Sequence, residues 1–95
     1  MKKNETLTII DENFTSDEAK DVIMNLFSSK LNYHQIKNWS SQEKFGKNDV
    51  IAQEKIPALK NEMKRFEEIL LEAKANNKKL VISSEINIEL LENTD

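Results

Sequence analysis

The sequence contains no cysteine and only one glycine, one proline and one histidine among its 95 residues. Without cysteine the chain forms no disulfide, and it offers no thiolate nucleophile and no sulfur ligand for a metal. A single glycine argues against a phosphate-cradling loop, and His34 has no second histidine with which to share a metal. No stretch approaches the roughly 18 apolar residues of a membrane span, and no export signal is recognisable.

These absences argue against several classes of enzyme. The sequence motifs of common hydrolases, zinc enzymes and nucleotide-binding enzymes are missing. Two carboxylate pairs have helical spacing, Asp17 with Asp21 and Glu68 with Glu72, but such pairs are more often a solvated helix face than a cation site. We therefore expect a non-enzymatic cytoplasmic protein with no catalytic residue, no cofactor, no bound metal and no membrane association.

The sequence does contain enough apolar material for one small domain. Hydrophobic residues make up 38% of the chain and charged residues 33%. We therefore expect residues 1–95 to form a single α+β domain with a compact core and a well-solvated surface. A domain of this size is only marginally stable unless its packing is good or a partner contributes contacts.

Two segments alternate apolar and polar residues, which is typical of strands. They are residues 5–10 and residues 80–90, and we expect them to pair antiparallel. The second segment is almost twice as long as the first. Either it bends or bulges near Ser83 and Ser84, or its far half pairs with something outside this chain.

Two further segments have helical periodicity. A capping box formed by Thr15 and Glu18 precedes a predicted helix over residues 16–30. Apolar residues at alternating spacings of four and three predict a second helix over residues 49–76, which Pro57 either kinks or divides in two.

The segment between these helices fits neither period. We expect residues 31–48 to form an irregular connection, and whether residues 31–40 add a third strand stays open. Gly46 is expected to adopt a left-handed backbone conformation.

The order of these elements predicts a β-α-α-β domain with its helical hairpin packed on one face of the sheet. Two strands make a poor sheet on their own, because three or more are normally needed for independent stability. We therefore expect a dimer in which either the sheet is extended by joining at an edge or the helical seams of the two chains pack together. The predicted assembly is a homodimer.

Charge is distributed unevenly along the chain. Residues 30–65 carry a net charge of +4, whereas residues 80–95 carry four acids and no base. Aromatic residues lie among the lysines of the basic stretch, and we take this mixture as a candidate partner-binding surface: Tyr33, His34, Lys37, Trp39, Lys44 and Lys47. The less dramatic interpretation is that the aromatic residues pin an irregular connection to the core and the lysines are solvated.

The function that these observations favour is a protein-interaction or assembly module that acts as a homodimer and presents a surface to another protein. The alternative is a nucleic-acid-associated accessory factor that uses the lysines and aromatic residues of segment 33–55. The acidic isoelectric point, near 5.2, disfavours this alternative.

Overall fold

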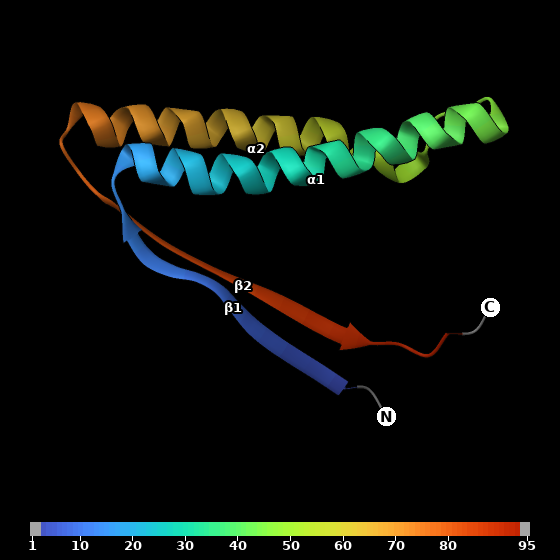
Figure 1. The fold of residues 1–95 in the computed structure, drawn as a ribbon, viewed down its shortest axis with the longest axis horizontal. Coiled ribbons are helices and arrows are strands. Elements are labelled where there is room, and N and C mark those ends of the chain that lie inside the picture. The colour runs from blue at the N-terminus through green and yellow to red at the C-terminus, as the bar shows by residue number, and fades with distance from the viewer. Residues whose placement is uncertain (1–2, 94–95) are drawn as a thin grey trace.

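The computed structural model describes residues 3–93, which form two strands and two helices (Figure 1). In chain order they are β1 (Lys3–Phe14), α1 (Ser16–Phe45), α2 (Val50–Ala75) and β2 (Leu80–Leu90). The two strands pair antiparallel and are called the ribbon below, and the two helices lie side by side and are called the hairpin. The predicted α+β class, the element order and the antiparallel pairing of the terminal strands are confirmed.

The ribbon is longer on its β1 side than predicted. β1 extends well beyond residues 5–10, because residues 11–14 also pair with residues 80–83. β2 has the predicted bounds and is paired along its whole length within the chain, from Leu80 opposite Phe14 to Leu90 opposite Lys3. The far half of β2 therefore needs no second chain to satisfy its pairing with a neighbouring strand.

The irregularity expected in the ribbon lies on β1. Thr8 is opposite Glu85 and Ile10 is opposite Ser84, which leaves Ile9 as the extra residue of a β-bulge. Residues directly opposite each other in a sheet share a face. The bulge therefore places Leu7 on the same face as Ile10, although three positions separate them along the strand.

The irregular connection predicted for residues 31–48 is wrong. α1 continues without a break from Ser16 to Phe45, so residues 31–45 are helical and no third strand forms within residues 3–93. The helix stops at Gly46, whose φ of 66° is left-handed as predicted and whose N–H donates to the carbonyl of Gln42. The connection between the helices is only residues 46–49.

Both helices begin with a side-chain cap. The predicted capping box is present on α1, where Thr15 and Glu18 exchange hydrogen bonds of 2.9 and 3.2 Å. On α2 the Asp49 carboxylate accepts from the backbone N–H of Ala52 at 2.9 Å. α2 runs continuously through Pro57, which answers the question that the sequence left open.

The heptad-spaced residues of α2 form its contact with α1. Seven residues of this seam are buried or half-buried: Ala52, Ile56, Leu59, Met63, Phe66, Leu70 and Ala73. Across the seam the rings of Phe27 and Phe66 lie 6.3 Å apart between centroids, a distance at which tilted aromatic pairs attract. The seam faces the neighbouring helix of the same chain.

The ribbon meets the hairpin only at one end. The core joins the base of the ribbon to the adjoining ends of the helices and consists of Ile10, Phe14, Ala19, Leu70, Ala73 and Leu80. From this junction the ribbon and the hairpin diverge (Figure 1), so that the hairpin covers one face of the ribbon near its base alone. The radius of gyration is 17.1 Å, whereas a compact domain of this length has about 12 Å.

Candidate functional site

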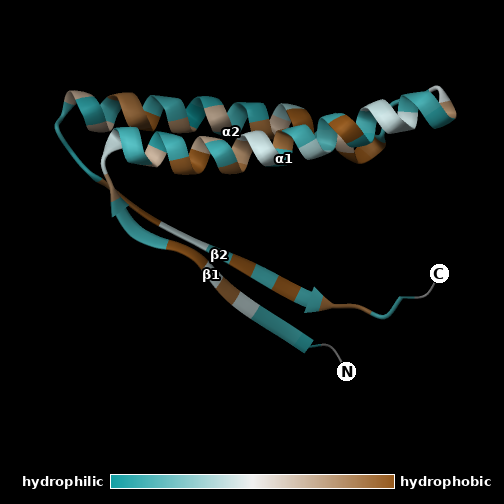
Figure 2. Cartoon of the chain, viewed as in Figure 1, coloured by the Kyte–Doolittle hydropathy of each residue, from teal (hydrophilic) through white to brown (hydrophobic). Residues whose placement is uncertain are grey.

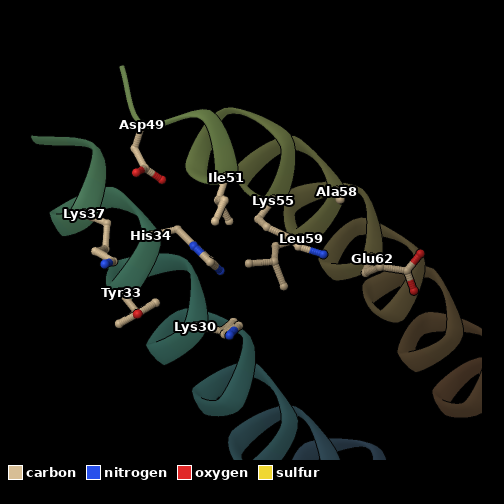
Figure 3. A pocket seen from close by; sticks show the side chains of 10 residues that line it. All are labelled: Lys30, Tyr33, His34, Lys37, Asp49, Ile51, Lys55, Ala58, Leu59 and Glu62. Carbon is tan, nitrogen blue, oxygen red and sulfur yellow. The ribbon is translucent and has the colours of Figure 1, made fainter. Parts of the chain in front are cut away.

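A groove of about 610 Å³ lies between α1 and α2, near the turn of the hairpin. We call it the His34 groove (Figure 3). Its walls come from both helices and from the cap of α2, and they combine basic, acidic and apolar side chains: Lys30, Tyr33, His34, Lys37, Asp49, Ile51, Lys55, Ala58, Leu59 and Glu62.

His34 lies at the bottom of this groove. Its side chain projects from α1 toward α2 (Figure 3), and the residue is only 5% exposed. The Nε2 atom is buried and has no hydrogen-bond partner within residues 3–93, while the imidazole packs edge-on against the Tyr33 ring at 5.2 Å between centroids. A buried polar atom without a partner costs about 1–3 kcal/mol, so His34 lowers the stability of the single chain.

Three lysines surround His34. The Nζ of Lys30 lies 5.4 Å from the centre of the Tyr33 ring, a cation–π distance. Lys37 and Lys55 form no ion pair with any residue of the described chain. All three have their charge available to a ligand at the mouth of the groove.

The two acids of the groove are already engaged. The Glu62 carboxylate accepts from Arg65 at 2.9 Å, and the Asp49 carboxylate caps α2. The groove therefore presents a basic rim around a buried imidazole and an apolar wall formed by Ile51 and Leu59. Such an arrangement suits a carboxylate or another anion attached to an apolar body.

The structure brings together half of the six residues predicted for a partner-binding surface. Tyr33, His34 and Lys37 line the groove. The other three do not line it: Trp39, Lys44 and Lys47. Trp39 is 62% exposed, Lys44 lies in the last turn of α1, and Lys47 belongs to the connection.

The groove also contains lysines that the predicted set lacks. They are Lys30, which lies four residues before His34 on α1, and Lys55, which comes from the opposite helix. Lys30 could have been found by continuing the predicted helix 16–30 through His34, because side chains four positions apart share a face of a helix.

A second unpartnered surface lies on the ribbon. Beyond the core the face that contains Leu7 carries Lys3 and Glu5, which form an ion pair of 3.6 Å. Its other members there are four apolar residues that are 38–57% exposed: Leu7, Ile86, Ile88 and Leu90. We call these four residues the apolar ribbon face. Figure 2 shows this continuation as apolar segments on both strands beyond the point where the ribbon leaves the hairpin.

The described residues contain no group of three or more side chains of the usual metal-ligating types that could hold a metal ion. None of the helices in this part of the chain is both long and apolar enough to cross a membrane. No family model, curated protein or solved structure matched this chain when it was compared with known proteins. Its function is therefore inferred from its own surfaces.

Proposed function

We propose that this chain is a non-enzymatic protein-interaction module that acts as a homodimer and presents the assembled surface to a further protein. The observation that carries the proposal is the amount of surface left open. The accessible surface is 7971 Å², whereas a compact monomer of 11.0 kDa exposes about 5,600 Å². A standard protein interface removes about 800 Å² from each partner.

Part of this exposed surface is apolar, as a protein-binding surface requires. The apolar ribbon face continues the core directly, because Leu7 and Ile86 follow Ile10 and Ile82 on the same side of the ribbon. On the hairpin, Val22, Leu26 and Ile69 are also 39–49% exposed. Contiguous exposed apolar surface of this kind marks interaction sites in stable proteins.

A second copy is the occupant that these surfaces fit best. The ribbon is a two-stranded sheet, which is too small to be stable without further layers. A two-fold arrangement would cover the apolar ribbon face of both protomers with the same contact. Face-to-face packing differs from the edge joining and the seam packing expected from the sequence, and it is the arrangement that covers the exposed apolar residues of the ribbon.

The proposal is tested by analytical ultracentrifugation of the purified chain from about 1 to 200 μM, beside the variants Leu7→Lys and Ile88→Lys. We expect a dimer for the native chain and a shift toward monomer for both variants, because each buries a charge in the contact. The matched control is Glu54→Lys on α2, which should leave the dimer unchanged. A native chain that stays monomeric throughout this range contradicts the proposal.

Nucleic-acid association is the second candidate. It is favoured by three lysines and an exposed aromatic ring on one groove, namely Lys30, Lys37, Lys55 and Tyr33. Titration of labelled single- and double-stranded DNA and RNA at 50 and 200 mM salt tests it. Binding that weakens steeply with salt would support this role, and the lack of salt-sensitive binding would remove it.

A further inference from the structure

We propose that in the homodimer the polar face of one protomer's ribbon lies in the His34 groove of the other, with Glu85 of the partner subunit beside His34, Lys37 and Lys55. This inference rests on the proposed homodimer and specifies how its two chains meet. It gives Lys37 and Lys55, which form no ion pair within the described residues, a carboxylate at the mouth of the groove.

The His34 groove opens on the side of the hairpin that faces the ribbon. A second, smaller groove lies where the helices meet the start of β2, and its lining includes Phe66, Ile69 and Ile82. Glu62 lines both grooves. One continuous surface therefore runs along the hairpin from its contact with its own ribbon to His34.

The ribbon has two different faces. Its apolar face is turned toward its own hairpin, because Ile10 and Leu80 on that side belong to the shared core. The opposite face carries Glu85, which is exposed, and the cross-strand pair Thr6 and Asn87, whose side chains are hydrogen-bonded at 3.1 Å. Within one chain, Glu85 consequently points away from the groove.

The ribbon and the hairpin diverge from their contact (Figure 1), and Leu7, Ile86 and Ile88 on the inner face of the ribbon are 38–52% exposed. If a second protomer enters with the opposite orientation, the apolar ribbon faces of the two chains stack on each other. Each polar face then rests on the hairpin of the other chain. The layers follow the order hairpin, ribbon, ribbon, hairpin, which is two-fold symmetric and leaves both apolar ribbon faces covered.

The lengths of the elements agree with this arrangement. Glu85 lies five residues from the start of β2, about 17 Å at 3.3 Å per residue. His34 lies 18 residues from the start of α1, about 27 Å at 1.5 Å per residue. In the dimer the ribbon–hairpin contacts of the two protomers lie at opposite ends of the hairpin. If Glu85 of the partner subunit lies beside His34, the two distances add to about 44 Å, close to the roughly 45 Å length of α1. The partner's junction then sits beside the turn of the hairpin.

The charges agree as well. Residues 30–65 carry a net charge of +4, and residues 80–95 carry only acidic charge. Lys37, Lys55 and Glu85 take part in no ion pair within the described chain. Complementary charges of this kind select the orientation of two surfaces and exclude wrong registers.

Cysteine cross-linking tests the contact directly, because the native chain contains no cysteine. In the double variant Lys37→Cys, Glu85→Cys we expect mild oxidation to yield disulfide-linked dimers. The matched control is Lys44→Cys with Glu85→Cys, which should give at least fivefold less cross-linked dimer, because Lys44 lies more than a turn beyond the groove. Equal yields, or a disulfide closed within one chain, would overturn the inference.

Charge reversal gives an independent measurement. Lys37→Glu and Glu85→Lys should each raise the dimer dissociation constant at least fivefold, and the double reversal should bring it back to within about threefold of native. Lys44→Glu should change it less than twofold. Additive effects of the two reversals overturn the inference while leaving the homodimer in place, whereas a native chain that never dimerises overturns the proposed function itself.

Discussion

The side-chain carbonyl of Asn38 accepts a hydrogen bond of 2.8 Å from the backbone N–H of Asp49, across the turn that joins the two helices. Asn38 belongs to α1 and Asp49 caps α2, so this bond fastens the end of one helix to the beginning of the next. A further bond between the side chains of Gln42 and Asn48 closes the same turn. The connection is short and tied down on both sides, which fixes the geometry of the neighbouring His34 groove.

The first prediction concerns this fastening. Asn38→Ala should lower the free energy of unfolding by about 1 kcal/mol, because the partly buried N–H of Asp49 loses its acceptor. Asn38→Asp keeps an acceptor oxygen and should cost less. Urea unfolding followed by circular dichroism measures both free energies of unfolding. If the two variants lose the same stability, the acceptor oxygen of Asn38 is not the source of the stabilisation.

The second prediction concerns the capping box. The backbone N–H of Thr15, with a smaller contribution from its hydroxyl, holds the pKa of the Glu18 carboxyl below its ordinary value. Because the folded-state pKa is the lower one, the resulting stability is present above the unfolded pKa, about 4.3, and is lost as the pH falls through the folded pKa.

Glu18→Gln should therefore destabilise the chain at pH 7, and its difference from native should shrink toward pH 3. The measurement is thermal unfolding at several pH values. Glu67→Gln, which removes the same charge from the exposed side of α2, is the control. A difference between native and Glu18→Gln that is independent of pH would contradict the assignment.

The third prediction separates folding from association at His34. Since Nε2 is buried without a partner, His34→Leu should stabilise the monomer by about 1–2 kcal/mol. The same substitution should change the dimer dissociation constant less than twofold, because the buried Nε2 presents no surface to a second chain. Urea unfolding in the Leu7→Lys background measures the first effect and ultracentrifugation in the native background the second. Tyr33→Leu, an exposed neighbour, should alter stability by less than about 0.5 kcal/mol.

The fourth prediction concerns the stop of α1. An added Cβ at Gly46 would meet no atom within 4 Å, but the φ of 66° disfavours any side chain. Gly46→Ala should therefore cost about 1 kcal/mol of backbone strain, and Gly46→Asn should cost less, since asparagine tolerates this conformation better. Differential scanning calorimetry of the two variants measures which one is less stable. Equal losses of stability would contradict the explanation by backbone strain at Gly46.

The sequence predicted the fold wherever a local signal was strong. The capping box at Thr15, the alternation over residues 80–90 and the heptad spacing of α2 each mark an element that the structure confirms. In these segments the backbone preference and the apolar pattern agree. The same local agreement explains the left-handed stop at Gly46.

The second half of α1 was missed because its buried positions are polar. After Leu31 the buried or half-buried residues of this segment are all polar, so the apolar periodicity that reveals a helix disappears: His34, Asn38, Ser40 and Ser41. Packing on the apolar seam of α2 keeps the segment helical, which is a tertiary effect that a local pattern does not contain. The extension of β1 has a similar origin, because Asp11 and Asn13 resemble a turn until β2 lies opposite them.

Only three of the six residues predicted for the partner-binding surface line the groove, because the helical course of residues 31–45 was not predicted. Tyr33, His34 and Lys37 share one helical turn and stay together in any conformation close to a helix. Grouping them with Trp39, Lys44 and Lys47 treated nearness in the sequence as nearness in space. Lys55 reaches the groove only through the antiparallel return of α2, so its contribution depends on the tertiary fold.

Because Ile9 is the extra residue of a bulge, β1 should tolerate the deletion of one residue at this position but not elsewhere along the strand. Deleting Ile9 would restore plain alternation and keep Leu7 and Ile10 on the same side. Deleting Thr6 would instead move each side chain between Thr6 and the N-terminus of the strand to the opposite face of the ribbon. In homologous sequences, gaps of one residue should therefore collect at this point of the strand.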